Sequence, residues 1–351
     1  MAIKDEEYLK RNILAVYYKH EPQYTNLPYY RFMGQKELET LFFNKVMYFT
    51  DPVEWKKSST GDANETYFED WFRDKDNIYK AYRLIKESSE KRLGQYCTQQ
   101  YIMGVYSDFV AAAALLQQRT FCYCVSNKYA DAKMVQEYHK KYGRNFIIKY
   151  KNDFYKKLSI LDQGNYVPMG IYLFADIMPM VYINCFEDYI EKYICESHTL
   201  DQVAKNAFDF GAFLKHSSFS YEHEIRVKLR IHLDEYYNLQ TLSNEFYRVV
   251  FALQNDDEIV SKSMAFIDFV EDKVNYIFDD VRDKIKDIAG KQCFELKLSA
   301  EISINDIVDS IVLHDKASTE EKSLAYKLRD SSGISIIETD FDKFANGFRL
   351  T

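Results

Sequence analysis

The residues best suited to chemistry lie in one alternating segment, FSYEHEIRVKLRI, which spans Phe219–Ile231. Alternation of apolar and charged residues predicts a strand, because successive side chains of a strand point to opposite faces. One predicted face is apolar, which is typical of a half-buried strand. The other face presents two carboxylates followed by three cations: Glu222, Glu224, Arg226, Lys228 and Arg230.

Two carboxylates beside a guanidinium suit a reaction in which positive charge develops. Neighbouring carboxylates raise each other's pKa, and a nearby cation lowers it again. An ionised carboxylate can stabilise the oxocarbenium-like centre that forms when a glycosidic bond breaks. We therefore consider Glu224, or Glu222, a candidate catalytic residue. The competing interpretation is an exposed ladder of ion pairs between strands, because charge runs usually mark a solvated face.

Two residues in the N-terminal part of the chain, Arg31 and Thr50, could complete such a site. Arg31 is a lone cation in the aromatic stretch Tyr29-Tyr30-Arg31-Phe32, and a guanidinium suits bidentate contact with phosphate. Thr50 ends the predicted strand 46–50 and offers a hydroxyl. Each residue also has an interpretation without a function. Arg31 can be an edge-strand arginine that extends to solvent, and the Thr50 hydroxyl can begin the turn before Asp51-Pro52.

The sequence lacks the motifs that mark other kinds of functional site. The chain shows no P-loop, GxGxxG, HExxH, GxSxG or EF-hand pattern, and its seven His have no metal-ligand spacing. A metal-dependent nuclease that uses Glu222, Glu224 and Lys228 is a third hypothesis, but no acidic partner motif accompanies it. Cys122-Tyr123-Cys124 places two thiols on one strand face, and we interpret them as buried structural thiols rather than metal ligands. No bound metal is expected.

Composition indicates a soluble globular protein: 47% of the 351 residues are apolar, 28% are charged, and the net charge is −8. The chain has no basic stripe, so we expect no extensive binding of nucleic acid. Its first residues are too charged for a signal peptide, and its longest apolar run, 109–116, is too short to span a bilayer. With six Cys and no secretion signal, we expect reduced thiols, a cytoplasmic location and no membrane partner.

The elements that must position these residues alternate between strands and helices. Strands are predicted at 46–50, 120–125, 145–150, 166–174, 180–184, 294–298, 311–313 and 334–337, and helices at 5–20, 35–44, 130–142, 186–215 and 318–329. The pattern predicts a single α+β domain over 1–351 with a central mixed or antiparallel sheet. It also predicts a helical insertion at about 65–118 and a long C-terminal helical segment at about 243–289.

The segment 243–289 is expected as one long helix or a helical hairpin. Apolar residues recur in it at near-heptad spacing: Ile267, Val270, Val274, Ile277, Val281, Ile285 and Ile288. Such a seam either packs along the sheet or joins two copies of the chain in a homodimer through 267–288. We favour packing, because only about three heptads sustain the repeat.

Four segments together resemble the bacterial family called domain of unknown function 2971. Its first signature is similar to 30–32, a helix and then 47–52, and its second to 121–126 with Met134 and 138–143. Its third resembles Ser220-Tyr-Glu-His-Glu-Ile-Arg226, and its C-terminal signature resembles 307–313 with 316–321. The resemblance covers most of the chain and carries no activity with it.

A more distant resemblance implies an activity. An Arg on a first strand, a Ser or Thr at the end of a second and a Glu-x-Glu on a later strand resemble the ADP-ribosyltransferase fold. The resemblance implies that NAD is held by Arg31, Thr50, Tyr30 and Arg226. It also implies that Glu224 or Glu222 stabilises the ribose oxocarbenium ion. The acceptor would be an unidentified macromolecule.

Two functional hypotheses follow. The first is NAD-dependent ADP-ribosyl transfer by an intracellular bacterial toxin or phage-defence effector. The second is a non-enzymatic binding or regulatory module, in which the charged strand and the aromatic surface recognise a partner. Convergence of Arg31 and Glu224 on one hollow would favour the first, since catalysis needs both side chains at one ligand.

Overall fold

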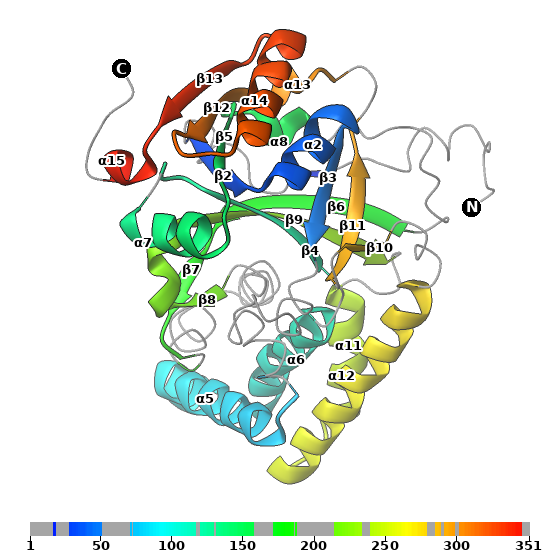
Figure 1. Cartoon of the computed structure of the whole chain (residues 1–351). Helices are drawn as coiled ribbons and strands as arrows, with labels where there is room; N and C mark the ends of the chain where they lie inside the picture. The colour runs from blue at the N-terminus through cyan, green and yellow to red at the C-terminus, as the bar shows by residue number, and fades with distance from the viewer. Residues whose placement is uncertain are drawn as a thin grey trace, which may run out of the picture.

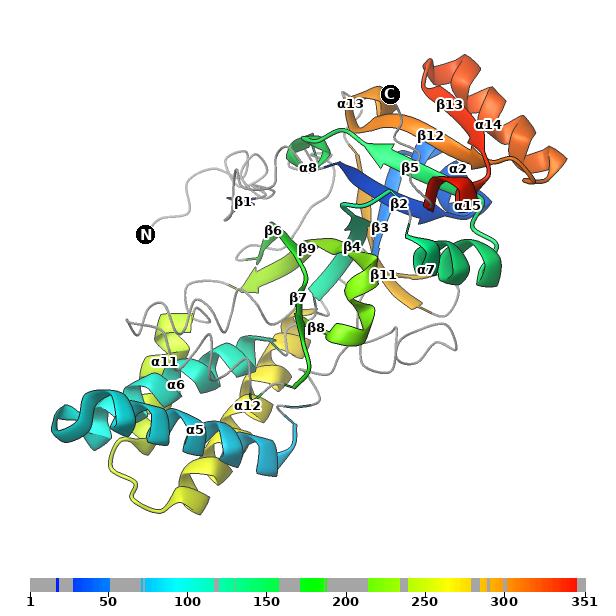
Figure 2. The ribbon, with the colours of Figure 1, turned by 90° about the vertical axis from the view of Figure 1, so that its left-hand side faces the viewer.

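A mixed β-sheet and a group of helices beside it make up the molecule (Figure 1). The computed structural model describes residues 17–18, 28–50, 71, 73–116, 120–129, 131–157, 171–185, 187, 214–233, 239–278, 285–288, 291–298 and 302–345. Figure 2 shows the sheet and the long helices at opposite ends of the molecule. The predicted α+β class is confirmed.

Within the described residues, eleven strands form the main sheet. Eight follow edge to edge in the order β1 (Tyr17–Tyr18), β6 (Ile171–Pro179), β9 (Glu224–Leu233), β4 (Thr120–Ser126), β2 (Tyr29–Met33), β5 (Phe146–Tyr150), β12 (Val308–His314) and β13 (Ser335–Thr339). A branch leaves β4 through β3 (Val46–Thr50), β11 (Lys291–Lys297) and β10 (Ile285–Ile288). The pairs β1–β6 and β12–β13 are parallel, and the other pairs are antiparallel.

The sheet divides at β4. Along one edge, β4 pairs with β9 over its whole length, from Thr120 to Ser126. Along the other edge it pairs with β3 at Cys122 and with β2 at Ser126. Cys124, between these two positions, has no strand partner on that edge within the described part of the chain. The strands β2 and β3 therefore diverge from a common neighbour, and the candidate site lies at this split.

Helix α2 (Gln35–Phe43) connects the two diverging strands. Its buried residues Leu38, Leu41 and Phe42 have the i, i+3, i+4 spacing that predicts an amphipathic helix. At its start, the Glu37 carboxylate accepts a hydrogen bond from the Gly34 N–H at 2.9 Å. This contact satisfies one backbone donor that a helix N-terminus leaves without an intrahelical partner.

The helical group comprises α5 (Lys75–Leu93), the 3₁₀ turn η1 (Gly94–Tyr96), α6 (Gln99–Leu116), α11 (Leu239–Val250) and α12 (Asp256–Phe278). Helix α6 packs against α5, α11 and α12 (Figures 1 and 2). Residues 109–114 of α6 are all buried. A helix that is apolar on every side must be enclosed in this way.

Shorter elements lie near the split and around the C-terminal strands. Near the split are α7 (Ala132–Met134), the π-helix η2 (Val135–Lys141), the parallel strands β7 (Val181–Ile183) and β8 (Leu214–His216), and the 3₁₀ helix η5 (Ser217–Glu222). Around the C-terminal strands are α8 (Phe154–Lys157), α13 (Ile304–Ile307), α14 (Thr319–Ser332) and α15 (Phe341–Ala345). Helix α14 begins with a capping box, in which Ser318 and Glu321 form reciprocal hydrogen bonds.

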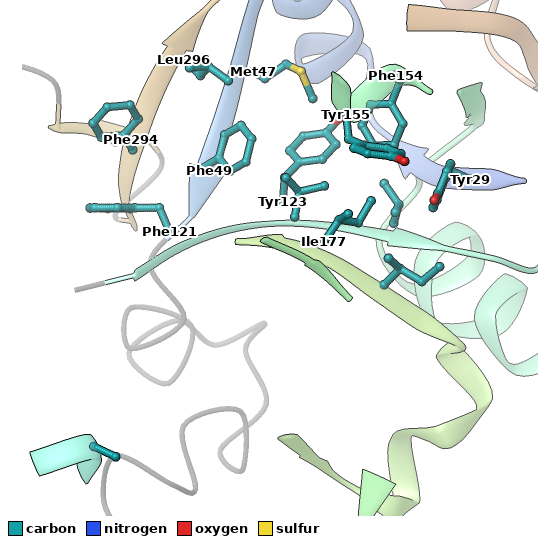
Figure 3. Packing of buried hydrophobic residues seen from close by; sticks show 14 of the residues in the cluster. Tyr29, Met47, Phe49, Phe121, Tyr123, Phe154, Tyr155, Ile177, Phe294 and Leu296 are labelled. Atoms are coloured by element: carbon teal, nitrogen blue, oxygen red, sulfur yellow. The ribbon is translucent and has the colours of Figure 1, made fainter. Parts of the chain in front are cut away.

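An aromatic core fills one side of the split (Figure 3). The Phe49 and Tyr123 rings, from β3 and β4, lie 5.4 Å apart. Tyr123 also shares a hydrogen bond with the Tyr150 hydroxyl of β5, so this core ties β3 and β5 to β4. Phe121 packs on Phe294 of β11 with ring centroids 5.6 Å apart. The split is therefore held by fixed aromatic contacts.

The predicted strands at 46–50, 120–125 and 145–150 are confirmed. The predicted start of the charged strand, at Phe219, is wrong. Residues 217–222 form the 3₁₀ helix η5, and β9 begins at Glu224. His223 stands between them with a left-handed backbone, φ 45°. A residue with positive φ interrupts the regular alternation of a strand. Glu222 is therefore not on the strand with Glu224.

The end of the predicted C-terminal helical segment is also corrected. The expected hairpin is confirmed over 243–278 by α11 and α12, but the described residues 285–288 form strand β10, which pairs with β11. Asn255 caps α12 by accepting from the Glu258 N–H at 3.0 Å, which favours a new helix at this point. Ile267 and Val270 are buried in the chain's own core, as the packing interpretation predicts. Because 285–288 are strand, the stretch 267–288 is not one continuous helical seam.

Two predicted helices fall largely outside the described residues. Of the predicted arm 5–20, only Tyr17–Tyr18 is described, and it forms strand β1 rather than helix. Of 186–215, the described residues at the end, Leu214 and Lys215, belong to strand β8. The predicted helix 130–142 is confirmed over 132–141, mostly as π-helix. Among the described residues, no helix has both the length and the apolar character that a membrane crossing requires.

Candidate functional site

A cavity of about 620 Å³ lies at the split between β2 and β3. Its wall contains five of the six predicted site residues, and Arg226 is the exception. The five come from β2, β3, η5 and β9: Tyr30, Arg31, Thr50, Glu222 and Glu224. Cys124 links the two ends of this group. Its carbonyl accepts from Arg31 Nη1 at 2.6 Å, and its thiol is hydrogen-bonded to Glu224. The structure therefore brings the predicted arginine and the predicted carboxylates together.

The inner end of the cavity is a cluster of buried ions that we call the carboxylate centre, formed by Glu222, Glu224, Lys215, Arg226 and Tyr138. Lys215 Nζ bridges the two carboxylates, 2.7 Å from Glu222 Oε2 and 3.0 Å from Glu224 Oε2. Arg226 Nε donates to Glu224 Oε1 at 2.6 Å, and the Tyr138 hydroxyl donates to Glu222 Oε1 at 2.9 Å. Arg226 is 1% exposed and supports Glu224 from behind the cavity wall.

The backbone that carries the two carboxylates is fixed on both sides of His223. The Ser126 hydroxyl donates to the Glu222 carbonyl at 2.8 Å. The Glu224 N–H donates to the Tyr182 hydroxyl at 2.9 Å, and the Glu224 carbonyl accepts from Met180 N at 2.9 Å. The positive φ of His223 costs free energy for a residue with a side chain, and such strain persists only where neighbouring contacts determine it.

Because the carboxylate centre is buried, the pKa values of its residues are set by burial and by the charges of the neighbouring residues in the cluster. Burial raises the pKa of Glu224, but the charges of Arg226 and Lys215 outweigh burial and hold that pKa well below its usual range. Burial and the neighbouring Glu222 raise the pKa of Tyr138 well above its usual value, and burial and Glu224 do the same for Cys124. Glu224 is therefore ionised at neutral pH, and Tyr138 and Cys124 keep their protons.

These contacts contradict one earlier interpretation. An exposed ladder of ion pairs would leave the charged face in solvent, but Glu222, Glu224 and Arg226 are all buried. The ladder interpretation is therefore wrong for these residues. The side chains of Lys228 and Arg230 lie outside the described part of the structure.

Arg31 occupies the split itself. Its guanidinium lies 4.2 Å from the centre of the Tyr123 ring and donates to the Cys124 carbonyl, which no strand pairs with at this point. Burial lowers the pKa of Arg31, but Tyr123 and Glu37 reverse that effect, so the guanidinium stays charged. The interpretation of Arg31 as an edge-strand cation extending to solvent is wrong, because its donor points inward.

The outer wall of the cavity is richer in cations than in carboxylates. Arg144, which follows η2, donates from Nη1 to the Phe32 carbonyl at 3.2 Å and lies 5.7 Å from the centre of the Tyr138 ring. The charged residues of the outer wall are Arg31, Lys36, Glu37, Glu137, Lys141 and Arg144. Four cations face two carboxylates, which leaves two net positive charges.

Thr50 lies in a row of polar side chains that crosses three strands. It pairs with Cys122 of β4 on one side and with Cys293 of β11 on the other. The Cys293 thiol lies 3.8 Å from the Thr50 hydroxyl. Of the two thiols predicted to be buried, Cys122 is buried and Cys124 is half-buried. Both line the cavity, as does the buried Cys293. Within the described residues, no group of three or more His, Cys, Asp or Glu side chains could hold a metal ion.

Three residues of the site were missed from the sequence: Lys215, Tyr138 and Arg144. Lys215 and Arg144 stand in segments without a motif or an alternating pattern, so no local signal marks them. Tyr138 lies in the second family-like signature, where its spacing to Met134 and Tyr142 indicates only a helix face.

Comparison of the chain with protein-family models, with curated proteins and with solved structures finds no match.

Proposed function

We propose that this chain is an NAD-dependent ADP-ribosyltransferase-like enzyme that acts as a bacterial toxin or phage-defence effector on a macromolecular acceptor. The observation that carries the proposal is the convergence of Arg31, Thr50 and the Glu222–Glu224 pair on one cavity. A cavity of about 620 Å³ is within the size range of small-molecule sites, roughly 300–1,000 Å³.

The two ends of the cavity have complementary chemistry for such a substrate. The cationic outer wall suits the negative diphosphate of NAD, since guanidinium groups bind phosphate oxygens in bidentate fashion. The carboxylate centre suits the opposite end, where positive charge develops on the ribose. Lys215 already lies between the two carboxylates, so this part of the cavity is built to surround a cation.

In the proposed reaction, the bond between the nicotinamide nitrogen and the ribose C1′ breaks and nicotinamide leaves with the bonding electron pair. The cationic ribose is stabilised by the ionised Glu224. A nucleophile of the acceptor then bonds to C1′ and releases its proton to solvent. Arg31 and Thr50 would hold the substrate, with Tyr30 beside them on the wall.

A second candidate, a non-enzymatic binding module, is favoured by one observation. All four carboxylate oxygens of Glu222 and Glu224 accept from a donor of the chain, namely Tyr138, Lys215 or Arg226. Such a closed cluster can be a structural support for a ligand site that performs no reaction. The two candidates differ in one measurable property, the release of nicotinamide.

The test is to incubate the purified chain with NAD and bacterial extract and to quantify nicotinamide by chromatography. We expect release by the wild type and a loss of about 100-fold or more in Glu224→Gln, because the charge that stabilises the transition state is removed. Glu87→Gln, on the exposed face of α5, is the matched control and should keep full activity.

Folding of Glu224→Gln is checked by its binding of ADP-ribose. If wild-type protein binds ADP-ribose but releases no nicotinamide with any extract, the binding module replaces the enzyme. If Glu224→Gln releases nicotinamide as fast as the wild type, Glu224 has no part in the reaction.

A further inference from the structure

Two arginines from different parts of the chain approach one carboxylate oxygen at the outer wall of the cavity. Arg31 Nη2, from β2, lies 3.7 Å from Glu37 Oε1, and Arg144 Nη2 lies 3.8 Å from the same atom. Both distances exceed hydrogen-bond length, so the carboxylate is attracted by two charges without a close hydrogen bond to either. Nothing in the sequence places Arg144 near Arg31, since they are separated by strands β3 and β4.

Each guanidinium is held in place by a backbone carbonyl rather than by Glu37. Arg31 Nη1 donates to the Cys124 carbonyl at 2.6 Å, and Arg144 Nη1 donates to the Phe32 carbonyl at 3.2 Å. A guanidinium has five N–H donors in a planar fork, so one bond to a carbonyl leaves most of them for other partners. Arg31 Nε has no hydrogen-bond partner among the described residues, although it is buried.

We propose that Arg31 and Arg144 form a clamp for the diphosphate of a nucleotide ligand, and that Glu37 is an internal anion which a ligand phosphate displaces. The inference rests on the proposed function, because it names how the ligand of the same cavity is held. Glu37 Oε1 marks the position between the two guanidinium groups that a phosphate oxygen would take.

The charge of the outer wall indicates a diphosphate rather than a single phosphodiester. Four cations and two carboxylates line this end of the cavity, which leaves two net positive charges. The diphosphate bridge of a dinucleotide carries two negative charges, so it neutralises this wall. Lys36 and Lys141 would add their ammonium charges beside the clamp without fixing its geometry.

The experiment is calorimetric titration of the full chain with ADP-ribose, inorganic pyrophosphate and inorganic phosphate at one salt concentration. In Arg144→Gln we expect ADP-ribose and pyrophosphate to bind about tenfold more weakly or worse, because charged hydrogen bonds to the ligand are lost. Glu37→Gln should bind both ligands more tightly, since the competing negative charge is gone. A glutamine at this position can still cap the start of α2, so the fold is kept.

Arg83→Gln, which removes an exposed arginine of α5, is the control for a change in net charge and should bind as the wild type does. Arg144→Gln with wild-type affinity would overturn the clamp. Equal weakening by Arg83→Gln would overturn it too, because general screening would then explain the effect. Equal affinity of the wild type for phosphate and pyrophosphate would overturn the assignment of a diphosphate.

The clamp and the enzyme can fail separately. Binding of ADP-ribose that depends on Arg144, without release of nicotinamide, would support the clamp and refute the transferase. Release of nicotinamide with equal KM in the wild type and Arg144→Gln would support the transferase and refute the clamp.

Discussion

Replacing Lys215 with methionine tests whether the carboxylate centre depends on its bridging ammonium. Methionine keeps an unbranched, flexible side chain but removes the charge. In the native chain the Lys215 side chain is 5% exposed, and its Nζ lies within 3.0 Å of both Glu222 and Glu224. The variant therefore leaves two buried carboxylates side by side, with Arg226 still bonded to Glu224.

We expect a large loss of stability from Lys215→Met. Removing one partner of a buried ion pair costs about 3–5 kcal/mol, because the other charge is left buried without its counter-ion. An exposed pair contributes less than about 1 kcal/mol. Lys80 Nζ lies 3.8 Å from Glu187 Oε1, with 56% of the lysine side chain exposed. Lys80→Met is therefore the matched control, because it removes the same charge from an exposed pair.

The assay is urea unfolding at pH 7, with the free energy of unfolding obtained from the midpoint and the slope. Adding Glu222→Gln to Lys215→Met removes the uncompensated charge, so the double variant should regain part of the lost stability. Unfolding of Lys215→Met at the same urea concentration as Lys80→Met would refute this reasoning. So would a double variant whose loss in free energy of unfolding equals the sum of the two single losses, because the buried ions would then not interact.

Two further predictions concern pH. The pKa of Glu224 in the folded chain is below its unfolded value of about 4.3, so its contribution to stability is complete above that pH and is lost as the pH falls further. Acid unfolding of Glu224→Gln should therefore depend less on pH below about 5 than that of the wild type; identical acid profiles would contradict this. His314 stacks on His139 with ring centroids 4.0 Å apart, and burial and His139 lower its pKa despite Asp315 and Asp340. A histidine held neutral in the fold costs stability as the pH falls below about 6.5, so His314→Gln should flatten the stability profile between pH 7 and 5; an unchanged slope in thermal unfolding would contradict it.

Local patterns predicted the strands that carry the site because those strands have strong, short-range signals. Val46–Thr50 and Phe146–Tyr150 are β-branched and aromatic runs beside turn residues, and both form strands at the predicted places. Residues 285–288 were predicted as the end of a helix because two isoleucines continue its spacing. These residues form a strand because they pair with β11. A pairing partner that comes from another segment leaves no pattern in the sequence of the strand itself.

The candidate site was predicted in part for a similar reason. Arg31, Thr50 and Glu224 stand out because each is polar in an apolar or alternating segment. Lys215 and Arg144 join them only through the fold, since β8 leads directly into η5 and Arg144 follows a π-helix. Burial also could not be predicted from the charges. A run of glutamate and arginine is typical of a solvated face, but Glu222, Glu224 and Arg226 are buried together with their counter-charges.

The split in the sheet explains why an arginine is needed at position 31, whatever the ligand. Where β2 and β3 diverge, the Cys124 carbonyl of β4 loses the partner that a continuous sheet would supply, and a buried carbonyl without a donor is costly. The Arg31 guanidinium supplies that donor and stacks on Tyr123, so it closes the gap in the ladder. Its planar fork uses one N–H for this purpose and keeps others at the wall of the cavity. A lysine could satisfy the carbonyl with one of its three donors, but it could not present a second, fixed edge to a phosphate. The same break in strand pairing thus opens the cavity and fixes a rigid cation at its wall, and structural support and ligand binding at Arg31 do not compete.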